Sequence, residues 1–439
     1  MNTSRRDLLK AGVGSLFIAT ISSPISAFSM MPMHSGRMLP PSKVPRVVIV
    51  GGGWAGVTAA KHLKKELGDK VDVVLIEKRK IFMSCPISNV WLGGLVEMDF
   101  LLHDFQTPAS KYGYHFINAT VTGINRHKRR VMTTEGYINY DYLILAPGIR
   151  YNYEAWFGKD RDLARLCATK FPSAFIPGSE HIALKRKIEN FEEGTFVLVV
   201  PPPPHRCPPA PYERAAMIAH VFKKNGIKGK LIILDPKKEI KPKGKGFGDA
   251  YKQLYGDIVE YVPNAKVKAV DPVKRVIKTT AGDFKFDDAN LNPPHQAGDL
   301  AWLAGLVNKK TGWCDVDPLT LQSKLDPRVF VAGDSASVKG FPKSGDMAHN
   351  HTQNMLVKAL AAIIRGKDPY SAVSAPTNTC YSMVNGKPKE AIVINVLYSI
   401  DRKKKAPKKK KVNVVNKRSS QLAESTFEWA KALYRDMFG

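Results

Sequence analysis

The cysteines are the residues of this 439-residue chain whose side chains could carry redox chemistry. No two of them form a C-x-x-C pair, so the spacing indicates neither a zinc knuckle nor a thioredoxin-type motif, and we predict no metal site. Their odd number leaves at least one outside any intrachain disulfide. The five are Cys85, Cys167, Cys207, Cys314 and Cys380.

Cys207 has the most unusual surroundings, because it lies in the proline-rich run between Pro201 and Pro211. Proline offers no N–H to a phosphate, and the chain has no glycine between Thr195 and Asn225. The loop is therefore a poor site for a nicotinamide nucleotide. A helix is predicted over 212–222, and we expect its N-terminus to lower the pKa of the Cys207 thiol and favour the thiolate.

A glycine-rich turn near the start of the chain provides the second chemical signal. An apolar run over 47–50 leads into a G-x-G-x-x-G set, and helical spacing follows it. The first glycine permits a tight turn, the second lets a pyrophosphate approach the backbone, and the third lets the helix pack closely. This strand–turn–helix unit predicts a dinucleotide site, formed by Gly51, Gly53, Trp54, Ala55 and Gly56.

Three later strand ends complete the predicted site. The strand over 71–76 ends at Glu77 and Lys78, where a carboxylate could hold a ribose hydroxyl. A further apolar strand ends at Ala146 and Gly148, which allow close approach to a ligand. Another ends at Gly333 and Asp334, and the carboxylate of Asp334 could reach a ribityl hydroxyl.

These elements predict an α/β fold with two Rossmann-like dinucleotide-binding domains and a small C-terminal α+β domain. The first domain is discontinuous and covers 46–157 and 299–369, because its strands lie on both sides of an insertion. The insertion, 158–298, is the second nucleotide-type domain and carries the Cys207 loop. The C-terminal domain covers 370–439 and closes with an amphipathic helix over 420–438, with Leu422, Trp429, Leu433 and Met437 near one face.

The N-terminus has the pattern of an export signal. Arg5 and Arg6 form a twin-arginine signature, and an apolar stretch and small residues near Ala27 follow. We therefore predict a signal over 1–27, a linker over 28–45, and a mature protein in the periplasm. The stretch is too short and too rich in Gly and Ser for a convincing membrane span, although an uncleaved anchor remains an alternative.

Four separated segments resemble the flavoprotein subunit of flavocytochrome c sulfide dehydrogenase, within the glutathione-reductase-like FAD superfamily. The likeness runs from about residue 44 to about residue 400. It implies a bound FAD, attached through Cys85 to the flavin 8α carbon, with Lys343, Ser344 and Gly345 facing the pyrimidine ring. The segments are 84–89, 206–214, 341–345 and 378–382.

The resemblance also implies the chemistry. Cys207 and Cys380 would form a redox disulfide beside the flavin, which sulfide opens, and electrons would pass through FAD to a c-type haem. The chain has no C-x-x-C-H motif, so that haem would lie on a partner cytochrome. Glu213 matches a carboxylate that could act as acid or base near the sulfur, or it could simply cap its helix or pair with Arg214.

The formal net charge of +28 predicts an anionic partner or surface, and no nucleic-acid recognition module is visible. Residues 402–418 hold ten Lys or Arg and no acid. Such a run is either a solvated, partly disordered loop or an electrostatic dock for an acidic cytochrome.

The sequence therefore predicts an FAD-dependent dehydrogenase of sulfide or a related sulfur compound. A sulfide:quinone oxidoreductase remains an alternative, although it would need a quinone slot and a membrane-binding C-terminus, and this tail is basic and polar. An NADH dehydrogenase would need glycines where Pro201–Pro204 stand. A non-catalytic partner protein with a flavin fold would tolerate the loss of Cys207 and Cys380.

Overall fold

The computed structural model describes residues 36–439, so the predicted signal and the first part of the predicted linker lie outside the described residues. The largest sheet has six strands in the order β21-β22-β9-β1-β2-β5. All neighbours are parallel except β21 and β22. The strands are β1 (Arg46–Val50), β2 (Asp72–Glu77), β5 (His115–Asn118), β9 (Tyr142–Leu145), β21 (Gln322–Ser323) and β22 (Asp326–Val331).

The β-branched run that forms β1 is buried on both faces, as expected for a central parallel strand. Gly51 follows it with a φ of +104°, and α1 (Trp54–Leu67) begins three residues later. A Cβ atom on Gly56 would lie 1.8 Å from the Gly51 carbonyl oxygen. Helix and turn can therefore approach this closely only with glycine at position 56, which confirms the packing role predicted for it.

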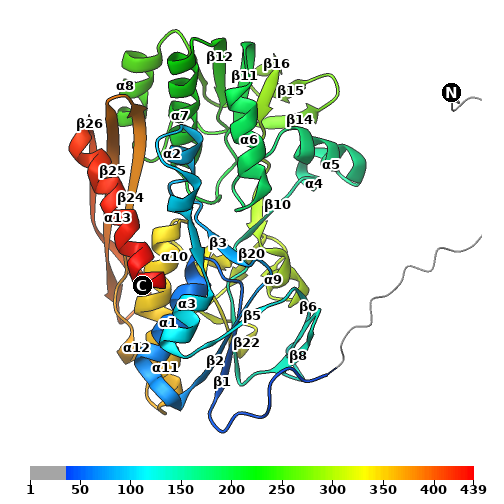
Figure 1. Ribbon diagram of the computed structural model, residues 1–439, viewed down its shortest axis with the longest axis vertical. Helices are drawn as coiled ribbons and strands as arrows, with labels where there is room; N and C mark the ends of the chain where they lie inside the picture. Colours follow the sequence, from blue (N-terminus) through cyan, green and yellow to red (C-terminus); the bar gives the residue numbers. More distant parts are fainter. Residues whose placement is uncertain (1–35) are drawn as a thin grey trace, which may run out of the picture.

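A second parallel sheet, β13-β12-β11-β17, lies at the opposite end of the molecule (Figure 1). Its strands are β11 (Glu193–Val199), β12 (Lys228–Leu234), β13 (Val259–Val262) and β17 (Asp288–Asn290). The helix predicted over 212–222 is longer in the structure: α7 runs from Ala210 to Asn225 and stops at Gly226, whose φ is +68°. The other helices of this region are α5 (Arg161–Lys170), α6 (Ser179–Glu189) and α8 (Gly244–Tyr255).

Short antiparallel pieces connect these two sheets. One pair, β10 with β18, joins the chain entering the second domain to the chain leaving it. Three further sheets have three strands each, β6-β7-β8, β14-β15-β16 and β19-β20-β23. Their strands are β6 (Val121–Asn125), β7 (Arg130–Thr133), β8 (Gly136–Asn139), β10 (Ile149–Tyr151), β14 (Val267–Asp271), β15 (Val276–Thr279), β16 (Gly282–Lys285), β18 (His295–Ala297), β19 (Val307–Asn308), β20 (Trp313–Asp315) and β23 (Ala336–Ser337).

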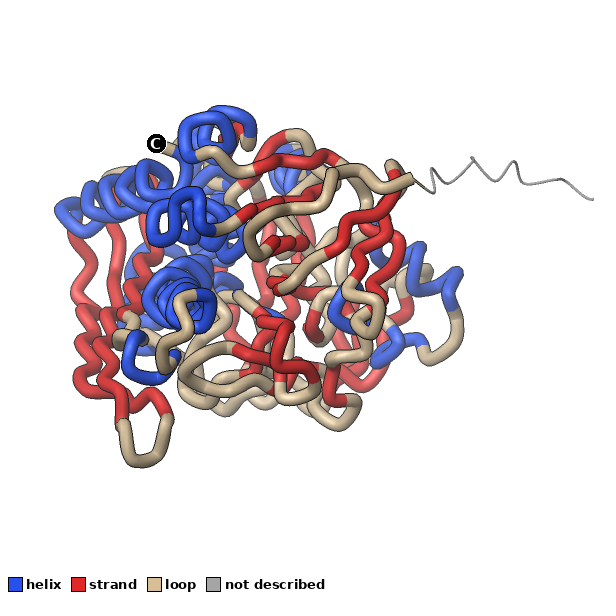
Figure 2. The backbone as a smooth tube through the Cα atoms, turned by 90° about the horizontal axis from the view of Figure 1, so that it is seen from below, coloured by secondary structure: helices blue, strands red, loops and turns tan. Residues whose placement is uncertain are grey.

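The C-terminal part is a three-stranded antiparallel sheet of β24 (Thr377–Gly386), β25 (Lys389–Asp401) and β26 (Ala406–Ser419), followed by α13 (Ser420–Phe438). Figures 1 and 2 show its long strands at one side of the molecule, with α13 beside them. The interpretation of 402–418 as a disordered loop is wrong: 406–418 belong to β26, which pairs with β25. Pairing along β25 orders this run although most of its lysines remain exposed.

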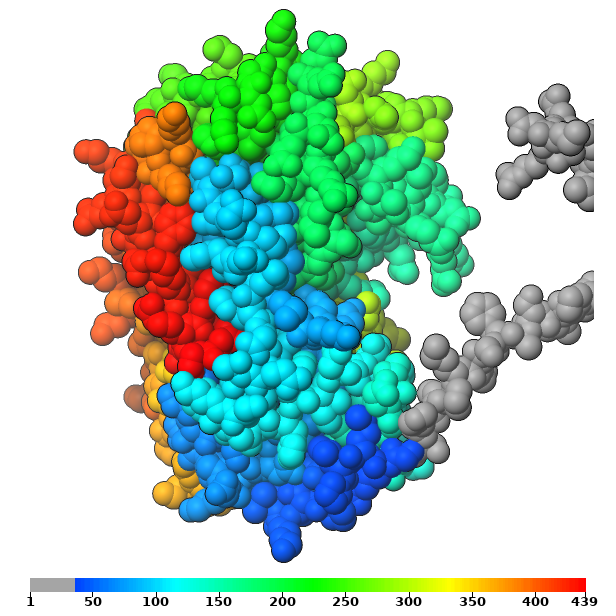
Figure 3. All heavy atoms as spheres, viewed as in Figure 1, coloured from blue at the N-terminus to red at the C-terminus, as the bar shows by residue number. Residues whose placement is uncertain are grey.

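Helix α13 has the bounds that its periodicity predicts, but its buried stripe is displaced. The centre of the stripe is formed by Ala423, Ala430, Tyr434 and Met437, whereas the predicted Leu422, Trp429 and Leu433 are only half-buried at its edge. The buried stripe therefore has small residues in its first half, Ala423 and Ala430, and large ones near its end, Tyr434 and Met437. Figure 3 shows this C-terminal segment in red, side by side with the light-blue segment that contains α2 (Ser88–Leu92).

The helical segment that follows Ser344 is irregular. It consists of α10 (Gly345–His351), a π-helical segment over Thr352–Val357, and α11 (Lys358–Ile364). The Ser344 hydroxyl caps it by accepting the Met347 N–H. Within residues 36–439, no helix combines the length and the apolar character needed to cross a membrane. The remaining elements are β3 (Ile81–Met83), β4 (Leu102–Asp104), α3 (Gln106–Tyr112), α4 (Glu154–Phe157), α9 (Asp299–Leu303) and α12 (Pro369–Ala372).

Candidate active site

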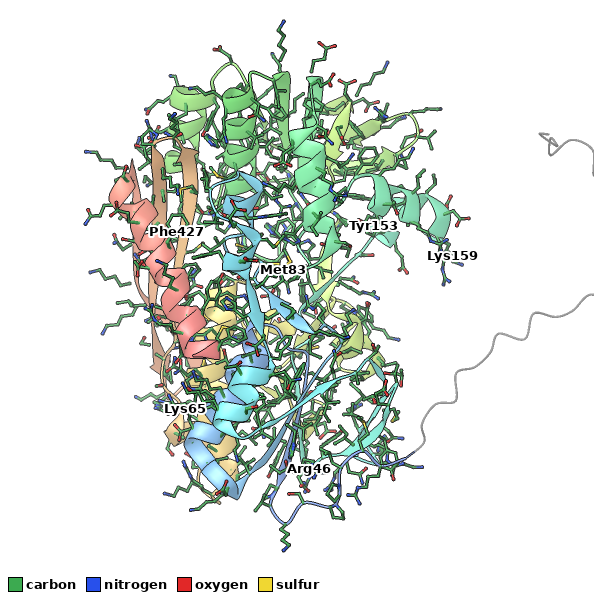
Figure 4. The ribbon with its side chains drawn as sticks, in the orientation of Figure 1. Arg46, Lys65, Met83, Tyr153, Lys159 and Phe427 are labelled. Carbon is green, nitrogen blue, oxygen red and sulfur yellow. The ribbon has the colours of Figure 1, made fainter. Side chains whose placement is uncertain are left out.

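A cavity of about 620 Å³ lies at the carboxyl ends of the parallel strands β1, β2, β9 and β22. This is the edge at which open α/β sheets bind their ligands, and the volume suits a cofactor. Met83 and Tyr153, labelled in Figure 4, are two of its lining residues. Fifteen of the predicted site residues also line it: Gly51, Gly53, Trp54, Ala55, Glu77, Lys78, Cys85, Ala146, Gly148, Cys207, Glu213, Gly333, Asp334, Ser344 and Gly345.

The glycine turn leaves room for a diphosphate. A Cβ atom on Gly53 would meet nothing within 4 Å, so the backbone at the start of α1 faces open space. No side chain caps this end of α1, and its free N–H groups with the positive end of the helix dipole are suited to phosphate oxygens. The buried Trp54 Nε1 also lacks a partner among the described residues. The residues present therefore fit a dinucleotide such as FAD.

Glu77 is held at the end of β2 beside this turn. Its carboxylate accepts hydrogen bonds from the Gly52 N–H at 2.7 Å and the Arg79 N–H at 3.0 Å. These contacts fix the carboxylate at the cavity wall, where the sequence places a ribose-binding acid. Its hydroxyl-binding role stays a prediction.

Asp334 lines the cavity at the end of β22, and its predicted role toward a ribityl hydroxyl stays a prediction. Its carboxylate forms an ion pair with Arg206, with Oδ2 2.5 Å from Nε. Arg206 also donates to the Phe175 carbonyl oxygen at 2.7 Å. Sequence reasoning missed Arg206 as a site residue, although it directly precedes Cys207. The guanidinium ties the cysteine loop to the cofactor-binding strand.

Lys343 is the predicted residue whose orientation differs most from expectation. It does not line the cavity, because its ammonium lies 3.6 Å from the centre of the Trp313 ring and donates to the Asp334 and Ala336 carbonyl oxygens. Burial lowers the pKa of Lys343 to about 8, although Asp334 opposes the shift. These contacts do not support a role of this ammonium at the flavin, which stays a prediction. Its carbonyl oxygen instead accepts the Cys207 N–H at 2.5 Å.

The thiol of Cys85 faces the same cavity from the loop after β3. Its Sγ lies 3.4 Å from the Phe175 carbonyl oxygen. Burial raises the pKa of Cys85, while the positive charges of Arg206, Arg79 and Arg214 oppose that shift. The structure thus places Cys85 where it could touch a bound cofactor.

Cys207 and Cys380 come from distant parts of the chain and meet at the cavity. Cys207 has a φ of +49° in the loop before α7, and Cys380 lies on β24. Both are free thiols in the structure, and a side-chain hydrogen bond joins them. Cys207 lines the cavity, whereas Cys380 is not among the residues that line it.

The two thiols are not equivalent. The electrostatics of the pair lower the pKa of Cys380 and raise that of Cys207, and the hydrogen bond between the two thiols is the largest cause. The expectation that the start of α7 makes Cys207 the thiolate is therefore wrong. Burial also raises the pKa of Cys207, and the ammonium of Lys243, with Nζ 3.9 Å from Cys380 Sγ, contributes to lowering the pKa of Cys380.

Glu213 lies beside this pair on the first turn of α7. Its carboxylate accepts from the Asn89 side chain and from the Met383 N–H, both at 2.8 Å. Burial raises the pKa of Glu213, which favours its protonated form. Among the described residues the carboxylate neither caps α7 nor forms an ion pair with Arg214, so the purely structural alternative is not supported. An acid–base role remains a prediction.

Sequence reasoning missed two buried cations, Arg214 and Lys243. Arg214 is 2% exposed and donates only to neutral oxygens, of Asn89, Ser173, Ala174 and Asn290. Its charge is therefore free to act on anions in the cavity. Arg214 adjoins the cysteine motif and could have been suspected, but Lys243 lies in a segment with no sequence signal.

The second domain has no free ribose-binding acid at the corresponding strand end. Asp235 follows β12, and its carboxylate accepts from the Tyr212 and Tyr261 hydroxyls at 2.5 and 2.9 Å and from Lys237 Nζ at 2.8 Å. The prolines before Cys207 occupy the place of a glycine turn. These contacts support the prediction that this domain does not take a nicotinamide nucleotide.

The other two cysteines lie in apolar cores. Cys314 on β20 is fully buried, and so is Cys167 on α5. Burial raises the pKa of each thiol to about 12. Their surroundings are those of small apolar residues.

A buried histidine next to the cavity makes the fold sensitive to acid. The Gly333 N–H donates to His351 Nε2 at 2.9 Å, and burial lowers the pKa of His351 to about 4. Between pH 6.5 and 4 the unfolded chain binds a proton that the folded chain does not. Stability is therefore complete above pH 6.5 and falls with decreasing pH, by at most about 1.4 kcal/mol per pH unit from this residue.

We expect His351→Gln to make this decline shallower, because glutamine keeps an acceptor for Gly333 and does not titrate. Urea unfolding of the holoprotein from pH 7 to pH 4 measures the slope. His127→Gln, at an exposed position, is the control. An unchanged slope in His351→Gln would contradict the prediction.

Three protein-family models match the chain. The model of the central part of the sulfide dehydrogenase (flavocytochrome c) flavoprotein chain matches residues 181–293, and the flavin-binding model of flavocytochrome c sulphide dehydrogenase matches 374–438. The pyridine nucleotide-disulphide oxidoreductase model matches 45–166. The resemblance that the sequence motifs predicted is confirmed, and FAD is supported as the cofactor.

Similar proteins include two sulfide:quinone oxidoreductases of mitochondria. The Mus musculus protein is 24% identical over 371 residues, 80% of this chain and 79% of its own length. The Dictyostelium discoideum protein is 24% identical over 365 residues, 78% of this chain and 76% of its own length. The solved sulfide:quinone oxidoreductase of Aquifex aeolicus has a TM-score of 0.69 at 18% identity and covers 90% of this chain and 92% of its own, which confirms the predicted fold class.

Proposed function

We propose that this flavocytochrome c sulfide dehydrogenase flavoprotein-like chain oxidises sulfide, or a closely related sulfur compound, and delivers the electrons to a c-type cytochrome on another chain. The family matches support an FAD-dependent sulfur oxidoreductase. The observation that carries the finer proposal is the meeting of Cys207 and Cys380 at the cofactor cavity. The twin-arginine signature supports a periplasmic location.

The side chains around the cysteine pair suit this chemistry. In the oxidised enzyme Cys207 and Cys380 would form a disulfide, and attack by HS⁻ would leave a persulfide on one cysteine and a thiolate on the other. The buried charges of Arg214 and Lys243 stabilise the anionic sulfur species. Glu213, with its raised pKa, could hold a proton beside them. FAD, held by the glycine turn, Glu77 and the strand ends, would accept the electron pair and release electrons singly.

Anaerobic titration tests the substrate. Adding sulfide to the holoenzyme is expected to bleach the oxidised flavin absorbance within the turnover time, whereas NADH at the same concentration leaves it unchanged, because the second domain has neither a glycine turn nor a free acid at β12. Bleaching by NADH alone would overturn the proposal. Loss of both responses would favour a non-catalytic role.

The electron acceptor is a separate question, and the similarity to sulfide:quinone oxidoreductases favours quinone as a second candidate. The two candidates are separated by supplying the sulfide-reduced enzyme with either cytochrome c or a short-chain ubiquinone. We expect reoxidation by the cytochrome. Faster reoxidation by the quinone would support the second candidate.

The exposed lysines of β26 support docking of an acidic cytochrome. Lys408, Lys409, Lys410 and Lys411 are all exposed on this edge strand, and β26 lies two strands from Cys380 in the same sheet. Electrostatic docking speeds association and weakens with salt. We expect the second-order rate of electron transfer to an acidic cytochrome to fall about tenfold between low and physiological ionic strength.

Charge reversal locates that docking surface. The Lys408→Glu/Lys410→Glu double variant is expected to lower the low-salt rate about tenfold. Lys268→Glu/Lys285→Glu makes the same change in net charge at exposed positions of the second domain and serves as the control. Equal losses in both variants would mean that only net charge matters and would contradict docking at β26.

A further inference from the structure

Lys243 is a buried cation brought to the cysteine pair from the second domain. It lies directly before α8 with a φ of +63°, a conformation uncommon for residues other than glycine, and it is 4% exposed. Its ammonium donates to the Cys380 carbonyl oxygen at 3.0 Å and to the Ser382 hydroxyl at 2.6 Å. These two hydrogen bonds hold the ammonium against β24, with Nζ 3.9 Å from Cys380 Sγ.

No carboxylate pairs with Lys243 among residues 36–439, so its hydrogen bonds go to neutral oxygens and to sulfur. A buried ammonium without a counter-ion is costly, and an anion next to it recovers part of that cost. The carboxyl groups that face Cys380 are those of Glu213 and Asp346, and both oppose a negative charge on its sulfur. Lys243 therefore supplies the positive charge at Cys380 against these two acids.

The pair is asymmetric in a second, independent way. Cys207 lines the cofactor cavity, whereas Cys380 is not among its lining residues and lies against Lys243. In thiol–disulfide exchange, the sulfur that forms the more stable thiolate is the better leaving group. The positive charge beside Cys380 therefore favours opening of the disulfide with Cys380 as the leaving sulfur.

We propose that Lys243 makes Cys380 the leaving sulfur when sulfide opens the Cys207–Cys380 disulfide, so that the substrate sulfur is transferred to Cys207. This rests on the function proposed above. HS⁻ forms a bond to Cys207 Sγ, and the bond between the two cysteine sulfurs breaks. Cys380 leaves with the bonding electron pair as a thiolate, and the proton remains on the outer sulfur of the Cys207 persulfide. The disulfide is the oxidant, so no further reagent is needed for this step.

The direction of opening can be read in the wild-type protein without any variant. The oxidised holoenzyme is treated anaerobically with a small excess of sulfide or, separately, of 2-mercaptoethanol, quenched in acid and mapped by peptide mass spectrometry. We expect the persulfide and the mixed disulfide on Cys207. Adducts on Cys380 would overturn the proposal. If the mixed disulfide forms on Cys207 but the enzyme does not oxidise sulfide, the direction of disulfide opening is supported and the proposed function is contradicted.

The role of Lys243 is tested on the reduced enzyme by alkylation with iodoacetamide as a function of pH, with each cysteine followed by its peptide. We expect Cys380 to have the lower pH midpoint in the wild type. Lys243→Met should raise that midpoint by about one unit or more, which slows alkylation near neutral pH about tenfold, and Lys243→Arg should restore it. A lysine with a merely structural role would move folding but not this midpoint.

The matched control is Lys245→Met, two residues along, where the side chain is exposed and pairs with Asp249. It removes the same charge and should leave both midpoints unchanged. Unchanged midpoints in Lys243→Met would overturn the role of Lys243. If Lys243→Met does not fold, Lys243→Gln, which removes the charge and keeps a hydrogen-bond donor, takes its place in the same measurement, and an unchanged Cys380 midpoint in it would overturn the role of Lys243.

Discussion

Replacing Cys207 or Cys380 with serine is expected to lower the rate of sulfide oxidation by at least about 10³-fold, while FAD stays bound. Serine has nearly the same size and can still hydrogen-bond to the partner, but it cannot form a disulfide or a persulfide. The two side chains act as one unit, so the double variant should be no worse than either single variant. Stopped-flow measurement of flavin bleaching by sulfide gives the rate.

Cys167→Ala is the control for this prediction, because Cys167 is buried in a separate apolar core of the second domain. It should lose some stability and keep the rate. A Cys380→Ser enzyme that oxidises sulfide at the wild-type rate would remove the cysteine pair from the mechanism. Only the pairing of these sulfurs distinguishes the proposed dehydrogenase from a protein that merely keeps the flavin fold.

The parts of the site that follow local rules were predictable from the sequence. The turn around Gly51 and Gly56 requires glycine for steric reasons that any strand–turn–helix unit shares, and β1 has the buried β-branched run of a central parallel strand. The strand ends at Glu77 and Asp334 then lie at one edge of the sheet because parallel strands place their carboxyl ends together. Each of these inferences needs only a few neighbouring residues.

The electrostatics of the site depended on contacts that no local pattern encodes. The proximity of Cys207 to the start of α7 predicts a low thiol pKa, but Lys243 approaches the other sulfur from a segment far from both cysteines in sequence. Lys343 was expected at the flavin, yet its ammonium lies against Trp313. A charged side chain follows its nearest acceptors and rings, and these are set by tertiary packing.

The basic run over 402–418 is a second case in which the local pattern predicts only part of the structure. Its composition is typical of a solvated loop, and the lysines of β26 are indeed exposed. The backbone is nevertheless ordered, because β25 offers a long row of hydrogen-bonding partners. Charge density predicted the exposure correctly but not the strand.

Replacing Cys85 with serine is expected to abolish covalent attachment of the flavin without abolishing its binding. Cys85 is the cavity-lining cysteine outside the redox pair, and the charges of Arg206, Arg79 and Arg214 oppose the rise in its pKa that burial causes. We propose that this sulfur is the point of attachment. The glycine turn and strand ends would still hold FAD, so Cys85→Ser should purify yellow but release its flavin on acid precipitation.

Comparison with Cys207→Ser separates attachment from chemistry. Wild type and Cys207→Ser should both show flavin fluorescence at the protein band of a denaturing gel, and Cys85→Ser should not. In the sulfide assay we expect Cys85→Ser to be active, because it keeps the cysteine pair. Cys207→Ser lacks the pair and should be inactive. Release of flavin by acid from the wild type would contradict attachment at Cys85. Loss of fluorescence in Cys207→Ser alone would instead indicate that the flavin is attached to Cys207, in the loop before α7. Cys85 would then line the cavity without being the point of attachment.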